Sequence, residues 1–212
     1  MALLARRAEA LEQVCREIRS AGGEPFVVCA DLADAADAAE AEQALAQVID
    51  AAGRLDVLIN CAGTAHLSTF ADDAPSRWRS MIDTNLTGTL NISHPALAHL
   101  ADAAASSDRG TADLVTVGST AGRQGSPGTS VYAATKQAMA AWSEGLRREL
   151  APSGVRVGLI QPGLVGTPLA RSHGGSPGQG LHAEVVADAV AYVVTRPAGV
   201  AVAELVVRAA GR

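Results

Sequence analysis

Short runs of apolar residues alternate along the chain with longer segments in which apolar residues recur at helical spacing. Val, Ile and Leu dominate the short runs, as is typical of strands buried on both faces of a sheet, at residues 26–30, 55–60, 113–118, 155–160 and 202–207. Spacings of i, i+3, i+4 and i+7 between the runs predict amphipathic helices. Two such sets are Leu11, Val14, Cys15 and Ile18, and Leu45, Val48, Ile49 and Ala52. The alternation predicts an α/β fold in which helices cover both faces of a parallel sheet.

Three other stretches need separate interpretation. Apolar residues 1–5 run into two arginines and then into the first helical segment, as at the end of a further strand. The acidic segment 31–42 is interpreted as the solvated face of a helix. In the Gly- and Pro-rich segment 172–180, Gly174, Gly178 and Gly180 reproduce the spacing G-x-x-x-G-x-G of a phosphate-binding turn. No apolar strand leads into them and Pro177 interrupts them, so we favour chance spacing in a loop.

Composition and charge limit the classes of protein to which this chain can belong. The 212 residues are predicted to form one domain, 1–212, with a mainly aliphatic core, because 48% are hydrophobic and only 3% aromatic. The net charge of −5 argues against nucleic acid or an anionic membrane as the main partner. No stretch reaches the ~18–20 apolar residues of a membrane span, and charged residues interrupt the opening run too early for a signal peptide. The three cysteines and five histidines lack metal-ligand spacing, so we expect a reduced, cytoplasmic protein without a metal site.

The strongest chemical signal is a tyrosine followed four residues later by a lysine. Of the 17 basic residues, Lys136 is the only lysine, and Tyr132 precedes it in the segment YAATK. On a helix, positions i and i+4 share one face, so the phenol and the ammonium are predicted to point into one space. A neighbouring cation favours phenolate, so we expect Lys136 to lower the pKa of Tyr132 toward the range of a general acid–base.

Small and polar residues follow the predicted strands at the edge where ligands bind in open α/β sheets. Ser119 comes just after the strand at 113–118, and Asn85 lies in the helical segment before that strand. The turns at 60–63 (NCAG) and 161–167 (QPGLVGT) consist of small residues that let a cofactor approach the backbone. Four segments are therefore predicted to meet at one edge of the sheet.

Together these residues resemble the short-chain dehydrogenase/reductase family over essentially the whole chain. The resemblance implies a Rossmann-like, doubly wound parallel sheet. It further implies that Tyr132 gives a proton to a substrate carbonyl, while Lys136 lowers the pKa of that phenol and holds the nicotinamide ribose. Ser119 would orient the carbonyl oxygen, and Asn85 would hold a water in a proton relay.

The resemblance also implies a set of cofactor-binding residues. Asp31 and Leu32, after the strand at 26–30, match the family's adenine contact. The adenosine-side turn corresponds to Asn60, Ala62 and Gly63, with Cys61 where the family usually has a second Asn. Tyr132 and Lys136 also contact the cofactor, and the nicotinamide-side loop corresponds to Pro162, Gly163, Val165 and Thr167.

Residues 5–7 bear on the choice of cofactor. NAD-preferring members of the family carry an acidic residue where Ala5 stands, and Arg6 and Arg7 follow it. A guanidinium there suits a ribose 2′-phosphate, so the resemblance implies NADP(H) rather than NAD(H). The alternative is that the two arginines are surface charges at the start of a helix.

The family's first strand and its glycine-rich turn T-G-x-x-x-G-x-G are not found, so the fold is expected to lack its first βα unit. In the order 3-2-1-4-5-6 that strand is central, and its neighbours would expose unpaired ladder groups inside the sheet. Either the two neighbours pair directly, or a partner chain supplies the strand. A third hypothesis is that Met1 is an internal valine, encoded by GTG and misread as a start, with a native βα unit of roughly 30 residues before it.

Two functions remain open at this stage. The first is an NADP(H)-dependent oxidoreductase that interconverts a carbonyl and an alcohol of a small substrate by hydride transfer. The second is a cofactor-poor remnant that acts as a non-catalytic binding or assembly partner. The long Ala-rich helical segments 76–104 and 131–151 form the dimer face in the resembling family, so a homodimer or homotetramer is expected.

Overall fold

The structure is a computed structural model that describes residues 1–33, 39–171 and 180–210. Its strands are β1 (Ala2–Ala5), β2 (Phe26–Cys29), β3 (Val57–Asn60), β4 (Ala112–Val117), β5 (Val155–Pro162) and β6 (Glu204–Val207). Its helices are α1 (Ala8–Ser20), α2 (Ala39–Ala52), α3 (Pro75–Ile82), α4 (Gly88–Ser106), α5 (Ser130–Glu149), α6 (Pro168–Arg171) and α7 (Ala183–Val194). Short helical turns are the π-helical η1 (Asp83–Thr87) and the 3₁₀ turns η2 (Thr120–Gly122) and η3 (Ala151–Ser153). Every strand lies where the apolar runs predict one.

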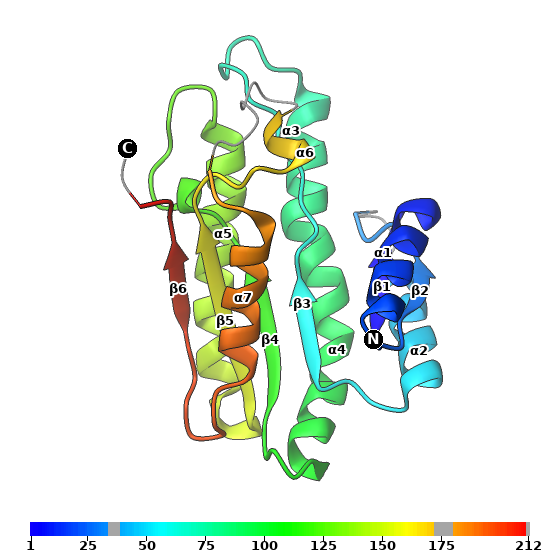
Figure 1. The fold of residues 1–212 in the computed structure, drawn as a ribbon. Coiled ribbons are helices and arrows are strands. Elements are labelled where there is room, and N and C mark those ends of the chain that lie inside the picture. Colours follow the sequence, from blue (N-terminus) through cyan, green and yellow to red (C-terminus); the bar gives the residue numbers. More distant parts are fainter. Residues whose placement is uncertain (34–38, 172–179, 211–212) are drawn as a thin grey trace.

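All strand pairs are parallel, and helices lie on both faces, so the predicted α/β Rossmann-like architecture is confirmed. In Figure 1, α7 lies in front of the sheet, while α4 and α5 lie behind it. The main core joins aliphatic residues of β4, β5, α2 and α4; its fully buried members include Leu100 and Leu114. Because crossover helices cover both faces, β5 is buried along almost its whole length.

The strands form two separate ladders, of order β1-β2 and β3-β4-β5-β6. Direct pairing of the strand at 2–5 with the strand at 57–60, one of the expected alternatives, is therefore wrong. Solvent reaches the strands on either side of the break between the ladders, since Ile59 of β3 is 43% exposed. Side-chain packing still connects the ladders, because Leu4 of β1 and Leu58 of β3 both pack against the main core.

Two sequence predictions fall partly outside the described residues. The acidic segment 31–42 leads into α2, where Glu40 and Glu42 occupy the first turn, but residues 34–38 are not described. Of the glycines at G-x-x-x-G-x-G spacing, Gly174 and Gly178 are not described either. None of the described helices combines the length and hydropathy needed to cross a lipid bilayer.

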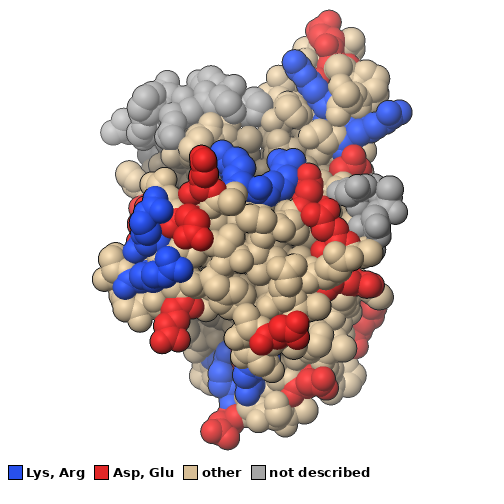
Figure 2. Space-filling model, turned by 90° about the vertical axis from the view of Figure 1, so that its right-hand side faces the viewer, with Lys and Arg blue, Asp and Glu red and all other residues tan. Residues whose placement is uncertain are grey.

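Acidic and basic side chains are interspersed over the face that carries α1 and α2. Figure 2 shows this face, and on its described part no continuous basic band of the kind that binds nucleic acid is visible. One ion pair of this region joins Arg6 to Asp31 at 3.4 Å, with both side chains largely exposed.

A buried ion cluster closes the amino-terminal edge of the larger sheet. Asp113, near the start of β4, has no exposed side-chain surface and accepts hydrogen bonds from Arg156 Nε and Nη2 at 2.8 and 3.0 Å and from Arg109 Nη2 at 2.8 Å. Arg156 is only 9% exposed, and its Nη1 donates to three carbonyls of residues 196–200. The cluster therefore ties β4, β5 and the turn before β6 together at the edge opposite the cavity described below.

Candidate functional site

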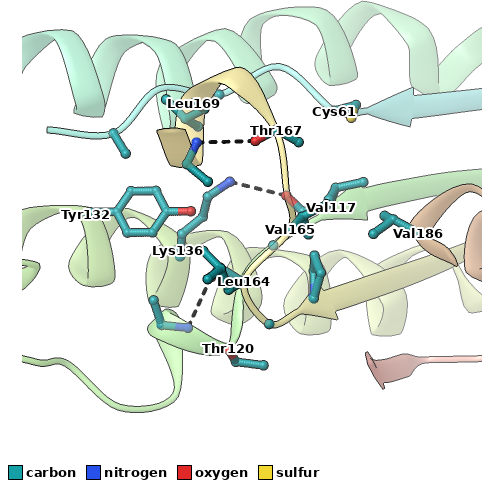
Figure 3. Close-up of a pocket in the computed structure, with 18 of the residues that line it drawn as sticks. Cys61, Val117, Thr120, Tyr132, Lys136, Leu164, Val165, Thr167, Leu169 and Val186 are labelled. Atoms are coloured by element: carbon teal, nitrogen blue, oxygen red, sulfur yellow. Dashed lines mark hydrogen bonds between the residues drawn. The ribbon is translucent and has the colours of Figure 1, made fainter. Parts of the chain in front are cut away.

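A cavity of about 1250 Å³ lies at the carboxyl ends of β3, β4 and β5. Doubly wound sheets bind ligands at this edge, because the strands end there in loops that are free to vary. Figure 3 shows how segments far apart in the sequence converge on it. Ten predicted site residues or their neighbours line the cavity: Cys61, Gly63, Val117, Ser119, Tyr132, Lys136, Pro162, Gly163, Val165 and Thr167.

Tyr132 and Lys136 extend from one face of α5 into this cavity, as their spacing predicts (Figure 3). Lys136 Nζ lies 5.9 Å from the centroid of the Tyr132 ring. The same Nζ donates to the carbonyl of Val117 at the end of β4, at 3.2 Å. That hydrogen bond fixes the ammonium between α5 and the sheet and leaves two of its three N–H groups for other acceptors.

The pKa of Tyr132 differs from the sequence expectation. Burial raises the pKa of the phenol above its usual 10, and a hydrogen bond from the neighbouring Ser119 lowers it only in part. The predicted lowering of this pKa by Lys136 is wrong for the protein without a ligand, because burial is the largest cause of the shift and the charge of Lys136 is not among its causes. Tyr132 is accordingly held protonated at neutral pH, ready to act as an acid.

Ser119 reaches the phenol because a tight turn follows β4. Its Oγ accepts a hydrogen bond from the N–H of Ala121 at 3.1 Å and begins η2. Gly122 closes this turn directly against α5, where an added Cβ would lie 2.8 Å from the carbonyl carbon of Lys136. Any larger residue would push the turn away from α5, so Gly122 sets the separation between Ser119 and Tyr132.

Asn85 is fully buried in the π-helical turn η1 and does not line the cavity. Its Oδ1 accepts from the N–H of Thr64 at 2.7 Å, and its Nδ2 donates to the carbonyl of Thr64 at 2.9 Å and to Thr135 Oγ1 at 3.1 Å. The side chain therefore holds the turn after β3 against α5, and the amide has little capacity left to hold a water. Single π-helical turns are frequent at functional sites because they re-aim side chains in this way.

The turn after β3 contributes fewer ligand contacts than the resemblance implies. Asn60 is buried, and its Nδ2 donates to Ser93 Oγ on α4 at 2.8 Å, so this side chain points away from the cavity. Ala62 does not line the cavity either, whereas Cys61 and Gly63 do. An added Cβ on Gly63 would lie 3.6 Å from Lys136 Nζ, so the absent side chain leaves space beside the ammonium.

The loop after β5 approaches the cavity from the other side. Pro162, Gly163, Val165 and Thr167 all line it, as the resemblance implies. The N–H of Gly163 donates to the carbonyl of Val207 at 2.7 Å, and Thr167 Oγ1 accepts from the N–H of Ala170 at 3.4 Å (Figure 3). The loop is thus held between β6 and the short helix α6.

Four of the residues predicted to bind the cofactor lie beside the smaller ladder and outside this cavity: Arg6, Arg7, Asp31 and Leu32. Arg6 faces Asp31, whereas the side chain of Arg7 has no hydrogen bond or ion pair with any described residue. Leu32 acts through its backbone, since its carbonyl accepts from Asn91 Nδ2 on α4 at 3.1 Å. The structure therefore brings Arg6 and Asp31 together, and gives Leu32 a role in joining the two ladders.

The described residues fit the nicotinamide half of a dinucleotide. Lys136 offers two free N–H groups beside the space that Gly63 leaves, as the two hydroxyls of a ribose require. Small residues in the loops after β3 and β5 leave the backbone accessible on both sides. Among the described residues, no three His, Cys, Asp or Glu side chains form a group that could hold a metal ion.

Replacing Lys136 by Met is expected to stabilise the ligand-free protein near pH 7. Burial lowers the pKa of Lys136 from 10.5 to about 8, a shift equivalent to about 3 kcal/mol at ~1.36 kcal/mol per unit. This cost is fully present below pH 8, and it is relieved between pH 8 and 10.5, where the unfolded chain binds a proton that the folded chain has lost. The stability difference between wild type and Lys136→Met in urea should therefore shrink as the pH rises.

The pKa itself can be read directly, because a chain with one lysine gives one side-chain resonance after isotopic labelling of lysine. A titration midpoint near that of a solvated lysine would contradict the lowered pKa of Lys136. A stability difference independent of pH between 7 and 10 would contradict it as well.

Sequence reasoning missed Gly122, Thr135 and the residues of 124–129 that line the cavity. The first of these carries a signal in hindsight, since a glycine three residues after Ser119 permits a close approach to the next helix. Thr135 sits between Tyr132 and Lys136, but its partner Asn85 is fifty positions away, which no local pattern indicates.

Comparison with known proteins agrees with the fold. The profile of the short chain dehydrogenase family matches residues 1–176. An uncharacterised oxidoreductase of Staphylococcus epidermidis is 31% identical over 206 residues, which cover 97% of this chain and 84% of that protein. Serine dehydrogenase from Escherichia coli superposes with a TM-score of 0.81 at 30% identity, covering 98% of this chain and 85% of that one. An alcohol dehydrogenase from the archaeon Thermococcus sibiricus, complexed with 5-hydroxy-NADP, superposes with a TM-score of 0.86 at 25% identity. The match covers 100% of this chain and 86% of that one. The chain therefore belongs to the short-chain dehydrogenase family of oxidoreductases.

Proposed function

We propose that this protein is an NADP(H)-dependent oxidoreductase that interconverts a carbonyl and an alcohol, with Tyr132 as the general acid and base. The observation that carries the proposal is the position of the Tyr132 phenol, which enters the cavity between Ser119 and Lys136. The alternative of a non-catalytic remnant is not favoured, since Ser119, Tyr132 and Lys136 all line one cavity in a chain that belongs to an oxidoreductase family.

In the reductive direction, Ser119 and Tyr132 donate hydrogen bonds to the carbonyl oxygen of the substrate. When bound, the reduced nicotinamide supplies the hydride that the carbonyl carbon accepts. Tyr132 gives its phenolic proton to the oxygen as negative charge develops there, and the positive charge of Lys136 stabilises the phenolate left behind. Asn85 acts as a positioning residue, because it holds the turn after β3 against α5.

In the oxidative direction the same phenolate removes the hydroxyl proton of the alcohol. Because burial raises the pKa of Tyr132 in the ligand-free protein, this direction is expected to gain rate as the pH rises.

Two observations support NADP(H) over NAD(H) in this proposal. Arg6 and Arg7 are exposed at the end of β1, where a ribose 2′-phosphate can pair with a guanidinium. Among similar proteins, a serine dehydrogenase 27% identical to this chain is described as complexed with NADP+, and the Thermococcus sibiricus enzyme as complexed with 5-hydroxy-NADP.

Replacing Arg6 by Ala is expected to weaken NADP+ binding by roughly ten- to hundredfold, the loss typical of one hydrogen bond to a charged group. Binding of NAD+ should change little, because it has no 2′-phosphate. Fluorescence titration with NADP+ and with NAD+ measures the dissociation constant of each cofactor for wild type and variant. Arg16→Ala serves as the matched control, since Arg16 is an exposed arginine on α1, the helix that follows Arg6. Equal losses for NADP+ and NAD+ would contradict this role of Arg6.

The overall proposal is tested by mixing the purified chain with NADP+ and a panel of primary and secondary alcohols, or with NADPH and the matching carbonyls. Turnover is followed by nicotinamide absorbance. Saturable cofactor binding together with turnover is expected. A folded protein that binds neither cofactor would refute the proposal and favour the non-catalytic alternative.

A further inference from the structure

The charged residues that line the cavity are all positive within the part of the chain that the structure describes. Lys136 and Arg208 are the only ionisable side chains of Asp, Glu, Lys or Arg type among the described residues that line it. Lys136 belongs to the reaction centre, but Arg208 has no part in the proposed chemistry. A cation without a carboxylate nearby favours a negatively charged ligand.

Arg208 is fixed to the nicotinamide-side loop through its backbone. It directly follows β6, and the preceding carbonyl, that of Val207, accepts the N–H of Gly163 at 2.7 Å. An added Cβ on Gly163 would lie 3.7 Å from both Cα and Cγ of Arg208, so the arginine stem runs over the turn after β5. The guanidinium itself is exposed and has no hydrogen bond or ion pair with any described residue.

Arg123, which also contacts β6, is an arginine with a structural role and gives a comparison for Arg208. Arg123 pairs with Glu204, and Gln161 donates to the same carboxylate. The one carboxylate of β6 is thereby neutralised and does not line the cavity. Arg208, four residues later, has no such partner among residues 1–33, 39–171 and 180–210.

The position of Arg208 in the sheet separates it from the far end of the cofactor. The strand order runs β2-β1, then β3-β4-β5-β6, and Arg6 lies on the smaller ladder while Arg208 follows the last strand of the larger one. Between them lie the turns after β3 and β5 that would hold the nicotinamide. A negative group at Arg208 therefore belongs to the substrate rather than to the 2′-phosphate.

We propose that the substrate carries a carboxylate that Arg208 binds, so that the reaction interconverts a hydroxy acid and the corresponding oxo acid. The inference rests on the proposed function and names its substrate class. Besides Arg208, the cavity is lined by apolar residues that include Leu164 and, from α7, Val186, Ala187 and Val190. These apolar side chains can accommodate the carbon chain of the acid.

The reaction balances with the carboxylate unchanged. The carbinol carbon loses a hydride to the oxidised nicotinamide, and the hydroxyl proton passes to the Tyr132 phenolate and then to solvent. The C–H and O–H bonds break as the C=O double bond forms. Two electrons leave the substrate, and Arg208 only holds the carboxylate in place.

The test compares acids with their uncharged esters. The probes are hydroxy acids of four to eight carbons, with the hydroxyl at carbon 2 or 3, and their methyl esters. Wild type is expected to show a KM for the best acid at least tenfold below that of its ester. Arg208→Leu should raise the KM for the acid by roughly ten- to hundredfold, as expected for one lost charge-assisted contact, and leave the ester unchanged. Arg208→Lys should restore part of the preference, and Arg148→Leu, at an exposed arginine of α5, should have no effect.

A second measurement does not depend on turnover. Ligand-observed NMR compares binding of the same acids and esters to wild type and to Arg208→Leu, with and without NADP+. Acid binding that depends on Arg208 supports the inference even if no probe is turned over. The lack of turnover would then refute the proposed function but leave the inference about Arg208 standing. Equal binding of acid and ester, an acid preference that survives in Arg208→Leu, or no binding of any probe would overturn the inference.

Discussion

Tyr132→Phe is expected to reduce turnover by roughly 10²- to 10⁴-fold, the range that a positioned proton donor contributes. The substitution removes one oxygen and keeps the ring, so packing on α5 and the free energy of unfolding should hardly change. Cofactor binding should persist, because Lys136 and the loops after β3 and β5 are untouched. Steady-state kinetics with the best substrate pair and NADPH titration measure the two effects separately.

The chain offers a matched control for this experiment. Tyr192 is its only other tyrosine, lies 49% exposed on α7, and stacks on Arg196 at 4.1 Å. Tyr192→Phe should leave turnover unchanged. If Tyr132→Phe retained wild-type kcat, the proton would have to come from another group, and the assignment of the acid would be wrong.

Asp113→Ala is expected to lower the free energy of unfolding by about 3–5 kcal/mol, because the buried Arg156 guanidinium would lose its counter-ion. A loss of this size is a large part of the ~5–15 kcal/mol that stabilises a typical domain. Urea unfolding followed by circular dichroism measures the loss. Activity per folded molecule should be preserved, since the cluster lies at the edge of the sheet opposite the cavity.

The double variant Asp113→Leu with Arg156→Met separates an unpaired charge from lost packing. Removing both partners is expected to recover much of the stability, because no charge is then buried alone. Glu144→Gln gives a surface comparison, since Glu144 pairs with Arg147 and Arg148 in an exposed position on α5, and should have far less effect. A single variant as stable as wild type would show that Arg156 finds water or another acceptor.

The order of the elements was predictable from the sequence because each buried strand is a continuous aliphatic run. Residues 113–118, for example, nearly coincide with β4 at Ala112–Val117. The shared direction of Tyr132 and Lys136 was equally predictable, since it depends only on helical spacing. Both inferences use local geometry alone.

The rest of the site depends on contacts that local patterns do not contain. Asn60 turns toward Ser93 on α4, 33 positions later, and Asn85 reaches back 21 positions to Thr64. The predicted direction of the Tyr132 pKa shift was wrong for the same reason. The shift depends on how closely the cavity walls exclude water from the phenol. Family resemblance named these residues without indicating what their side chains contact.

Across the break between the two ladders, the smaller ladder is joined to the larger sheet by side-chain packing and by the hydrogen bond from Asn91 to Leu32. Within the described residues no strand pairing joins β1 to β3, so these contacts, and no ladder hydrogen bonds, would have to break for the segment of β1, α1 and β2 to separate while β3–β6 remain paired. Arg6 and Tyr132 would then sit on different cooperative units. A dinucleotide that touches both must hold these units together, so its apparent affinity includes the free energy of ordering the smaller ladder as well as the contacts themselves.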